Sequence, residues 1–259
     1  MGSHIQKLDH MLKKKDVLVR YILATCESAQ KRLEWPMRVV ITGGPSSERI
    51  DRVRTLTNRS SGELAMKLAE RFAYAGYTVE LFLGAAAIWR SEFARYFQTN
   101  EELERLLSNI RYPESVNVVL HAAALSDFSL GEVIVAGGSD NSAKISSDVE
   151  SIQIRLVPKA KLIHRLRDWF PNAYLVGWKF EFNGTREQVV QKGIQQLQPN
   201  RTDACIVNGE AFGEGFGFCT EEGLLYTLPT RDQLADWLAH FLHHVVTNRE
   251  KERLGGDQS

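Results

Sequence analysis

The stretch from Arg38 to Gly84 reads RVVITGGPSSERIDRVRTLTNRSSGELAMKLAERFAYAGYTVELFLG. It begins as an apolar strand with a glycine turn, passes through a polar loop, and continues into an amphipathic helix that starts near Gly62. A conventional dinucleotide-binding unit passes directly from strand to helix and holds its phosphate at that turn. Here about 17 residues intervene, whereas βα loops usually have about 2–6, and so long a loop is usually functional. The stretch therefore predicts a modified nucleotide-binding fold.

The rest of the sequence alternates strand-like and helix-like segments, as an α/β fold requires. Strands are predicted at Arg38–Thr42, Thr78–Leu83, Val116–His121, Ser151–Leu156, Ala173–Trp178 and Ala204–Asn208, with a short hairpin near Phe216–Thr227. Helices are predicted at Gly62–Ala75, Glu101–Ser108, Lys159–Trp169, Arg186–Leu197 and Arg231–Val246. The polar segment Glu132–Ser151 is predicted to be a flap outside the core. We therefore expect an α/β, Rossmann-like three-layer fold with a mostly parallel central sheet and a smaller antiparallel flap.

The two ends of the chain differ from its middle. Met1–His4 reads as the remnant of an expression tag, and Ile5–Trp35 as an amphipathic helix that stops at Pro36. This helix is expected to pack on its own domain or across a dimer, with a basic membrane-surface helix as the alternative. The chain is thus divided into a tag remnant with a helical extension (residues 1–35), a main domain (residues 36–248), and a tail expected to be disordered (residues 249–259).

Composition excludes several classes of function. The formal net charge is zero, with 32 basic and 32 acidic residues, so no basic surface indicates nucleic-acid binding. Cys26, Cys205 and Cys219 are widely spaced and form no CxxC pair, so neither a zinc site nor a disulfide framework is indicated. No apolar run approaches the roughly 18 residues of a membrane span. We expect a cytoplasmic protein without nucleic-acid or membrane partners, and no metal site built from protein ligands.

Short motifs follow one another along the chain. They are Ile41-Thr42-Gly43-Gly44, Ile50-Asp51-x-Val53-Arg54, Asn58-Arg59-Ser60-Ser61-Gly62, Ala122-Ala123-Ala124-x-Ser126-Asp127-Phe128, Lys144-Ile145-x-Ser147, Val157-Pro158-Lys159, Val176-Gly177-Trp178-Lys179-Phe180-Glu181 and Ile206-Val207-Asn208. In this order they resemble phosphopantothenoylcysteine synthetase, the ligase of coenzyme A biosynthesis. The resemblance covers roughly Met37 to Val246, so residues 36–248 are expected to be the ligase domain.

The resemblance implies a specific reaction. It joins 4′-phosphopantothenate to L-cysteine through an acyl-nucleotide intermediate, with ATP or CTP as co-substrate. The amine of cysteine is the nucleophile, so the protein need not supply one. Mg²⁺ is expected, because it neutralises the triphosphate and needs few protein ligands. A homodimer is implied. Flavin is not expected, because the 36 residues before Met37 cannot encode the flavin domain that many bacterial relatives carry.

Three groups of residues are candidates for binding the nucleotide or the acyl intermediate. Gly43 and Gly44 form the turn, and Ser60, Ser61 and Gly62 open a helix whose free amides favour phosphate, although a serine there is equally suited to capping. By resemblance, Asn58 orients the acyl intermediate and Arg59 contacts substrate; a turn-forming Asn58 is the alternative.

Further candidates follow later strands. By resemblance, Ala123, Asp127 and Phe128 contact the nucleotide, although a turn or capping role for Asp127 is the alternative. Lys144 is a catalytic, nucleotide-contacting lysine by resemblance, and a solvated loop lysine otherwise. Lys159 lies at a predicted helix start, where a lysine suggests an anionic partner; Lys161 is the competing candidate. By resemblance, Asn208 contacts substrate and Phe218, after a glycine-rich loop, covers a base; a simple flexible hairpin is the alternative.

Departures from the family pattern keep other functions open. Pro45-Ser46-Ser47 replaces the usual threonine after the glycine pair, and Gly209-Glu210 follows Asn208. An NAD(P)-dependent oxidoreductase on a Rossmann-like sheet is one alternative, but the chain lacks the GxGxxG turn. A catalytically silent nucleotide-binding relative is another.

Overall fold

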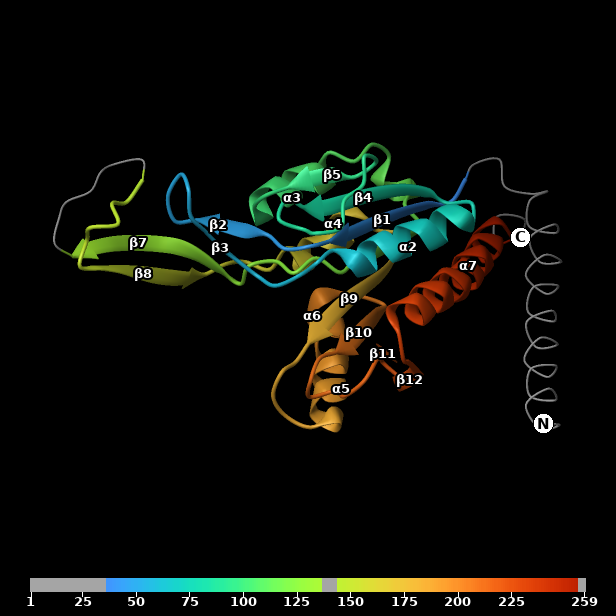
Figure 1. Cartoon of the computed structure of the whole chain (residues 1–259). Coiled ribbons are helices and arrows are strands. Elements are labelled where there is room, and N and C mark those ends of the chain that lie inside the picture. The colour runs from blue at the N-terminus through green and yellow to red at the C-terminus, as the bar shows by residue number, and fades with distance from the viewer. Residues whose placement is uncertain (1–35, 137–143, 256–259) are drawn as a thin grey trace, which may run out of the picture. The chain divides into compact units, whose positions relative to one another are not determined.

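A computed structural model describes residues 36–136 and 144–255 of the chain (Figure 1). The tag remnant and the helix predicted at Ile5–Trp35 lie outside the described residues. From Met37 onward the chain forms one compact unit. None of the helices in the described part is both long enough and apolar enough to cross a membrane.

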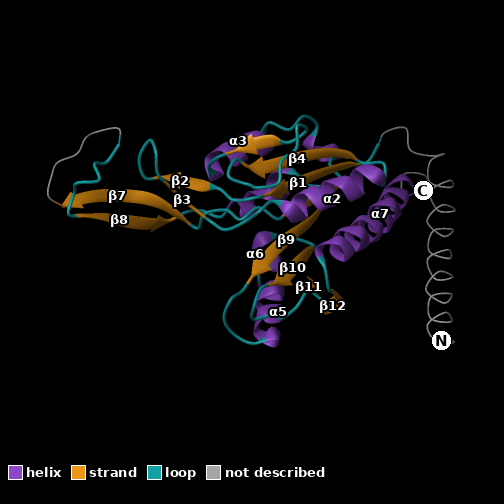
Figure 2. Ribbon diagram, in the orientation of Figure 1, coloured by secondary structure: helices purple, strands orange, loops and turns teal. Residues whose placement is uncertain are grey.

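The unit is built around a mixed eight-stranded sheet with the strand order β12-β11-β10-β9-β6-β1-β4-β5 (Figure 2). The strands are β1 (Arg38–Gly43), β4 (Thr78–Gly84), β5 (Arg95–Phe97), β6 (Val118–His121), β9 (Tyr174–Phe180), β10 (Ala204–Asn208), β11 (Phe216–Thr220) and β12 (Gly223–Leu228). All pairs from β10 to β5 are parallel, and β11 and β12 add an antiparallel edge. The prediction of a mostly parallel central sheet is therefore confirmed.

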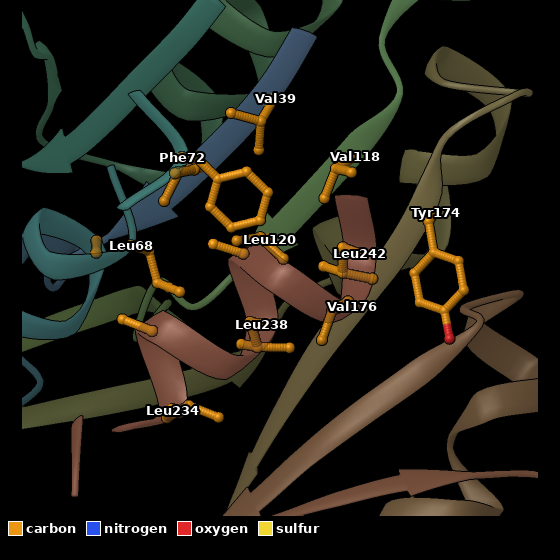
Figure 3. Close-up of a cluster of buried hydrophobic side chains, with 14 of the residues drawn as sticks. Val39, Leu68, Phe72, Val118, Leu120, Tyr174, Val176, Leu234, Leu238 and Leu242 are labelled. Atoms are coloured by element: carbon orange, nitrogen blue, oxygen red, sulfur yellow. The ribbon is translucent and has the colours of Figure 1, made fainter. Parts of the chain in front are cut away.

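Helices cover both faces of this sheet because successive strand residues point to opposite sides. Val39 and Ile41 pack under α2 (Glu63–Tyr74) and α7 (Arg231–Gly255), in the core shown in Figure 3. Val40 faces the other way, toward a second core. That core is covered by α3 (Asn100–Ser108), η2 (Leu162–Arg165) and α4 (Leu166–Trp169), while α5 (Arg186–Gln195) and α6 (Leu197–Asn200) cover a third cluster. Burial of each such aliphatic side chain stabilises the fold by about 1.5–3 kcal/mol. Because side chains are buried on both faces of the sheet, helices are held against both faces.

Two small antiparallel sheets stand apart from the central sheet. β7 (Phe128–Ala136) pairs with β8 (Ser151–Pro158) to form a flap that is longer than the predicted Glu132–Ser151. The strand predicted at Ser151–Leu156 therefore belongs to this flap and not to the central sheet. The long loop after β1 is itself folded, because β2 (Ser47–Arg49) pairs with β3 (Thr55–Thr57). Strand β2 lies beside β7 (Figure 1). A short 3₁₀ turn, η1 (Pro113–Ser115), precedes β6.

The predicted helix at Lys159–Trp169 is wrong at its start. Pro158 is the last residue of β8, and the Lys159 amide donates to the Asp127 carbonyl at 2.9 Å, which continues the flap ladder. The helical turns therefore begin only at Leu162. Since Lys159 does not lie at a helix start, the helix-dipole reason given for its anionic partner fails.

The predicted disordered tail is also wrong in part, because α7 continues to Gly255. Two contacts tie this extension to the domain. The Arg249 guanidinium donates to Asp203 at 3.0 Å, and the Asn117 amide donates to Glu250 at 3.1 Å. Residues 249–252 are mostly charged and so lack the apolar period that marks a helix in sequence. Residues 256–259 lie outside the described part of the chain.

Candidate active site

The candidate site lies where the strand order reverses. After β1 the chain moves to β4 and β5 on one side, and then returns to β6 on the other side of β1. The carboxyl ends of β1 and β6 therefore flank a topological switch point, which is where open α/β sheets bind ligands. Gly43 ends β1 there and Gly44 follows it, and Ala122 to Ala124 follow β6.

The glycine pair allows two close approaches of the backbone. A Cβ on Gly43 would lie 2.2 Å from the Cβ of Ala65, so glycine here lets α2 pack directly on β1. Gly44 has φ of +72°, which favours glycine, and its carbonyl accepts from the Ala124 amide at 2.9 Å. The turn after β1 and the loop after β6 are thus joined as one floor.

A buried polar pair lies beneath this floor. Thr42 Oγ1 and His121 Nδ1 are 2.8 Å apart at the ends of β1 and β6, and the Ala123 amide donates to Thr42 Oγ1 at 3.4 Å. Burial lowers the pKa of His121 to about 4, so the imidazole is neutral at pH 7. The pair links both strand ends to the loop that carries Ala123.

The buried histidine is expected to make the protein less stable in acid. The folded pKa of about 4 lies below the ordinary value of 6.5, so the unfolded state binds more protons between these values. The stabilisation is therefore present above pH 6.5 and is lost as the pH falls toward 4, and this difference corresponds to about 3 kcal/mol. Urea unfolding of the native protein and of His121→Gln, across this pH range, measures it. The variant should show the weaker pH dependence, and equal slopes would contradict the assignment.

Asn58 reaches the same floor from the folded loop. It follows β3, and its side-chain amide donates to the carbonyls of Ala124 at 3.2 Å and Leu125 at 2.9 Å. The residue is exposed, but its amide contacts the loop after β6. Asn58 thus joins two segments that are far apart in the sequence. A residue that only formed a local turn would not make these contacts.

Helix α2 begins at Glu63, five residues after Asn58. Gly62 is the N-cap residue, with φ of +80°, and no side chain caps the helix there. Ser61 Oγ accepts from the Glu63 amide at 3.3 Å, so Ser61 satisfies one of the free amides. Arg59 is exposed and makes no ion pair or hydrogen bond with other described residues, which leaves its guanidinium available to an anion.

A buried carboxylate joins the folded loop to the flap. Asp51 Oδ1 accepts from the amides of Val53 at 2.8 Å and Arg54 at 2.7 Å. Asp51 Oδ2 accepts from Arg54 Nη1 at 2.5 Å and from the Ile145 amide at 3.2 Å, and Arg54 Nη1 also donates to the Ile145 carbonyl at 3.1 Å. Both backbone groups of Ile145 are therefore held.

This latch of Asp51, Arg54 and Ile145 positions the residue before it. Burial raises the pKa of Asp51, but the three backbone amides and the Arg54 guanidinium outweigh burial and lower it to about 2. The carboxylate is therefore charged throughout the neutral range. Ile145 is buried, while Lys144 is exposed beside it. Asp51 and Ile145 both belong to motifs noted in the sequence, but the motifs gave no sign that these two segments are in contact.

Lys159 has anionic partners within the protein. Its ammonium lies 2.7 Å from both Glu48 and Glu101, and its side chain is only 11% exposed. Burial lowers the pKa of Lys159, but the carboxylates of Glu101 and Glu48 outweigh burial and raise it. The competing candidate Lys161 is exposed. No sequence signal pointed to Glu48 or Glu101, because both are far from Lys159 along the chain.

Asp127 and Phe128 begin the flap. Both are exposed, and the Asp127 carbonyl accepts from the Lys159 amide. Among the described residues, the Asp127 side chain caps no helix and closes no turn, and it is exposed to solvent. Phe128 is 44% exposed opposite Pro158.

Asn208 lies at the carboxyl end of β10, farther along the same sheet edge. It is half-buried, and its carbonyl accepts from the Glu181 amide at 3.0 Å. Gly209 follows with φ of +114°, and a Cβ there would lie 2.2 Å from the Glu181 carbonyl. Glycine is therefore required for this close approach.

The prediction that Phe218 covers a base is wrong. Its ring is fully buried and packs against Trp237 at 4.9 Å and Phe241 at 5.2 Å, measured between ring centroids. Phe218 belongs to the core between β11 and α7. The glycine-rich loop before it suggested mobility, but the alternation of β11 turns this side chain inward.

The sequence of this domain matches one known protein family. Residues 36–238 match the family described as the DNA/pantothenate metabolism flavoprotein C-terminal domain. The chain belongs to this family. The matched range contains the motifs quoted above, together with Asn58, the latch and the glycine floor.

Curated relatives carry the same domain within longer chains. The coenzyme A biosynthesis bifunctional protein CoaBC of Thermococcus kodakarensis is 30% identical over 178 residues, which is 68% of this chain and 42% of that protein. The CoaBC protein of Methanocaldococcus jannaschii is 26% identical over 171 residues, or 66% of this chain and 40% of the relative. The chain thus spans less than half the length of these relatives.

Solved structures share the fold. A DNA/pantothenate metabolism flavoprotein from Streptococcus pneumoniae is 24% identical, with a TM-score of 0.70, and the match covers 81% of this chain and 99% of that chain. The Cab2 mutant H337A in complex with phosphopantothenate-cysteine is 17% identical, with a TM-score of 0.62, and the match covers 97% and 96% of the two chains. Both confirm the Rossmann-like α/β fold.

Proposed function

We propose that this chain is a ligase that joins 4′-phosphopantothenate to L-cysteine, with ATP or CTP, in coenzyme A biosynthesis. Family membership supports the proposal, as do the relatives named coenzyme A biosynthesis bifunctional protein CoaBC. The observation that carries it is the bond from the Asn58 amide to the loop after β6, because it gathers the separate motifs at the switch point.

The reaction needs an activated carboxylate. The carboxylate oxygen of phosphopantothenate attacks the α-phosphorus of the nucleotide, and the bond to pyrophosphate breaks. The amine of cysteine then attacks the carbonyl carbon of this mixed anhydride and loses a proton, and the nucleoside monophosphate leaves. Both leaving groups carry negative charge on phosphate oxygens, and the attack of the amine also places charge on the carbonyl oxygen, so the site must supply donors and cations and must exclude water.

The residues at the switch point are assigned to these tasks. Asn58 is assigned to the acyl nucleotide: two backbone carbonyls orient its NH₂ group, and its Oδ1 would accept from a donor on the intermediate. Gly43, Gly44, Ser60, Ser61 and Gly62 offer backbone amides at a turn and a helix start, where phosphate is favoured. Lys144 is assigned to the charge that develops on the α-phosphate, and Arg59 to the phosphate group of phosphopantothenate.

Other residues shape the rest of the site. Ala123 is small, so a flat base can approach the backbone after β6, with Asp127 and Phe128 at the flap entrance. Asn208 is assigned to phosphopantothenate. Lys159 contacts nucleotide only if an anion displaces Glu48 or Glu101.

Mg²⁺ fits this site as an ion carried by the nucleotide. Among the described residues, no three side chains of His, Cys, Asp or Glu gather as a metal cage. Mg²⁺ commonly keeps several waters and binds through substrate phosphates, so such a cage is unnecessary. It would neutralise the triphosphate charge. A homodimer, a cytoplasmic location and independence from flavin belong to the same proposal.

Pyrophosphate release tests the function. The purified chain is incubated with Mg²⁺, phosphopantothenate and cysteine, with ATP and CTP in parallel, and each component is omitted in turn. Sustained pyrophosphate release together with phosphopantothenoylcysteine is expected only in the complete mixture. Nucleotide binding without turnover would instead indicate a silent relative, and a change in nicotinamide absorbance would indicate an oxidoreductase. Either result would refute the ligase.

A further inference from the structure

Helix α7 carries two histidines one turn apart on its exposed face. His240 and His244 are both exposed, and their Nε2 atoms lie 3.2 Å apart. Their ring centroids are 4.5 Å apart, with the ring planes at 81°. Residues four apart lie on the same face of a helix, so the backbone itself brings these rings together.

The spacing of the two nitrogens suits a shared metal ion. Imidazole nitrogens bind Zn²⁺ at about 2.0–2.1 Å, so two such ligands are about 2.9 Å apart at a right angle and about 3.4 Å apart at a tetrahedral angle. The observed 3.2 Å lies between these values.

The neighbouring described side chains supply no third ligand to the pair. The His243 ring lies farther off, with its centroid 6.2 Å from that of His244 and 6.0 Å from that of Tyr77. Asp236, one turn before His240, is bound to Arg71. Among the described residues, no third His, Cys, Asp or Glu joins His240 and His244.

We infer that His240 and His244 form a two-ligand site for a divalent transition-metal cation such as Zn²⁺, with water completing the coordination. Imidazole suits Zn²⁺, Ni²⁺ and Cu²⁺, whereas Mg²⁺ prefers oxygen ligands. The site is therefore distinct in chemistry from the nucleotide-borne Mg²⁺ of the proposed reaction.

Titration calorimetry with ZnCl₂ on the full chain, without substrates and with excess Mg²⁺ present, tests the site. Compared with the native protein, His240→Ala and His244→Ala should each bind Zn²⁺ at this site at least about tenfold more weakly. His164→Ala is the matched control, because it removes an exposed histidine elsewhere and should leave binding unchanged. His4 and His10 are present in every variant, so their contribution cancels.

Folding is checked in the same variants. Both histidines are exposed and alanine favours helix, so thermal unfolding without metal should be unchanged or slightly higher. His240→Gln and His244→Gln provide a second pair that keeps side-chain size. Zn²⁺ binding that is equal in the native protein and all four variants, or that is absent from the native protein, would overturn the site and leave only a hydrogen bond between the rings.

Discussion

Replacing Asn58 with aspartate is expected to lower the rate of ligation by about 10²- to 10³-fold. The change keeps size and shape but replaces the NH₂ group with an oxygen. That oxygen would face the carbonyls of Ala124 and Leu125, which now accept from the amide. It would also place negative charge beside phosphate. The measurement is kcat for pyrophosphate release, with mass spectrometry for an acyl nucleotide that accumulates.

Asn172→Asp is the control for this variant. Asn172 is exposed, and its side-chain amide also donates to a backbone carbonyl, that of Glu114 at 2.9 Å. It precedes β9, so it lies at the amino ends of the parallel strands, whereas the candidate site lies at their carboxyl ends. Full activity is expected. If both variants kept full activity, Asn58 would have no role in the reaction.

Replacing Asp51 with asparagine is expected to lower kcat/KM by about 10²-fold, the size of effect that a displacement of about 1 Å can produce. The Oδ1 atom retains its bonds to the amides of Val53 and Arg54. The Oδ2 atom becomes an NH₂ group, which cannot accept from Arg54 Nη1 or from the Ile145 amide. The substitution therefore removes the bonds of Asp51 to the Arg54 side chain and to Ile145 but keeps the bonds that form the turn. The segment that carries Lys144 is then no longer held in place by Asp51.

Hydrogen exchange distinguishes a positional effect from general unfolding. In Asp51→Asn the Ile145 amide should exchange faster, while amides in β1 and β6 should keep their protection. Asp148→Asn is the control within the same segment, because Asp148 is exposed and contacts Ser146. Unchanged exchange at Ile145 in Asp51→Asn would contradict the latch.

Acid should open the same latch. The folded pKa of Asp51, about 2, lies below its ordinary value of 3.8. The charged carboxylate therefore stabilises the latch above pH 3.8, and this contribution is lost as the pH falls toward 2. Loss of activity near neutral pH must have another origin.

Local patterns in the sequence predicted the parts whose cause is local. Apolar strands and amphipathic helices appear as periods of 2 and 3.6, so β1, α2 and the alternation of elements were readable. The position of Gly43 and Gly44 at the end of β1 followed from the same pattern. The motifs at Asn58 and Asp127 were also readable by resemblance, because each is a continuous run of residues.

Local patterns failed where a distant partner decides the outcome. Lys159 read as a helix start, but pairing of β8 with β7 extends the strand through Pro158, and two carboxylates then hold its side chain. Phe218 read as a loop aromatic, but α7 covers it. Arg249 was predicted to lie in a disordered tail, but it lies in α7, which is longer than predicted, and it forms an ion pair with Asp203.

The sequence by itself determined the α/β class, the family and the segments that carry polar chemistry, because periodicity and short motifs are encoded in neighbouring residues. The tertiary structure alone decided which segments meet. The contacts of Asn58 with Ala124 and of Asp51 with Ile145 join residues 66 and 94 positions apart. Hydrogen bonds and ion pairs over such separations depend on how the sheet orders its strands, and no local pattern records that order.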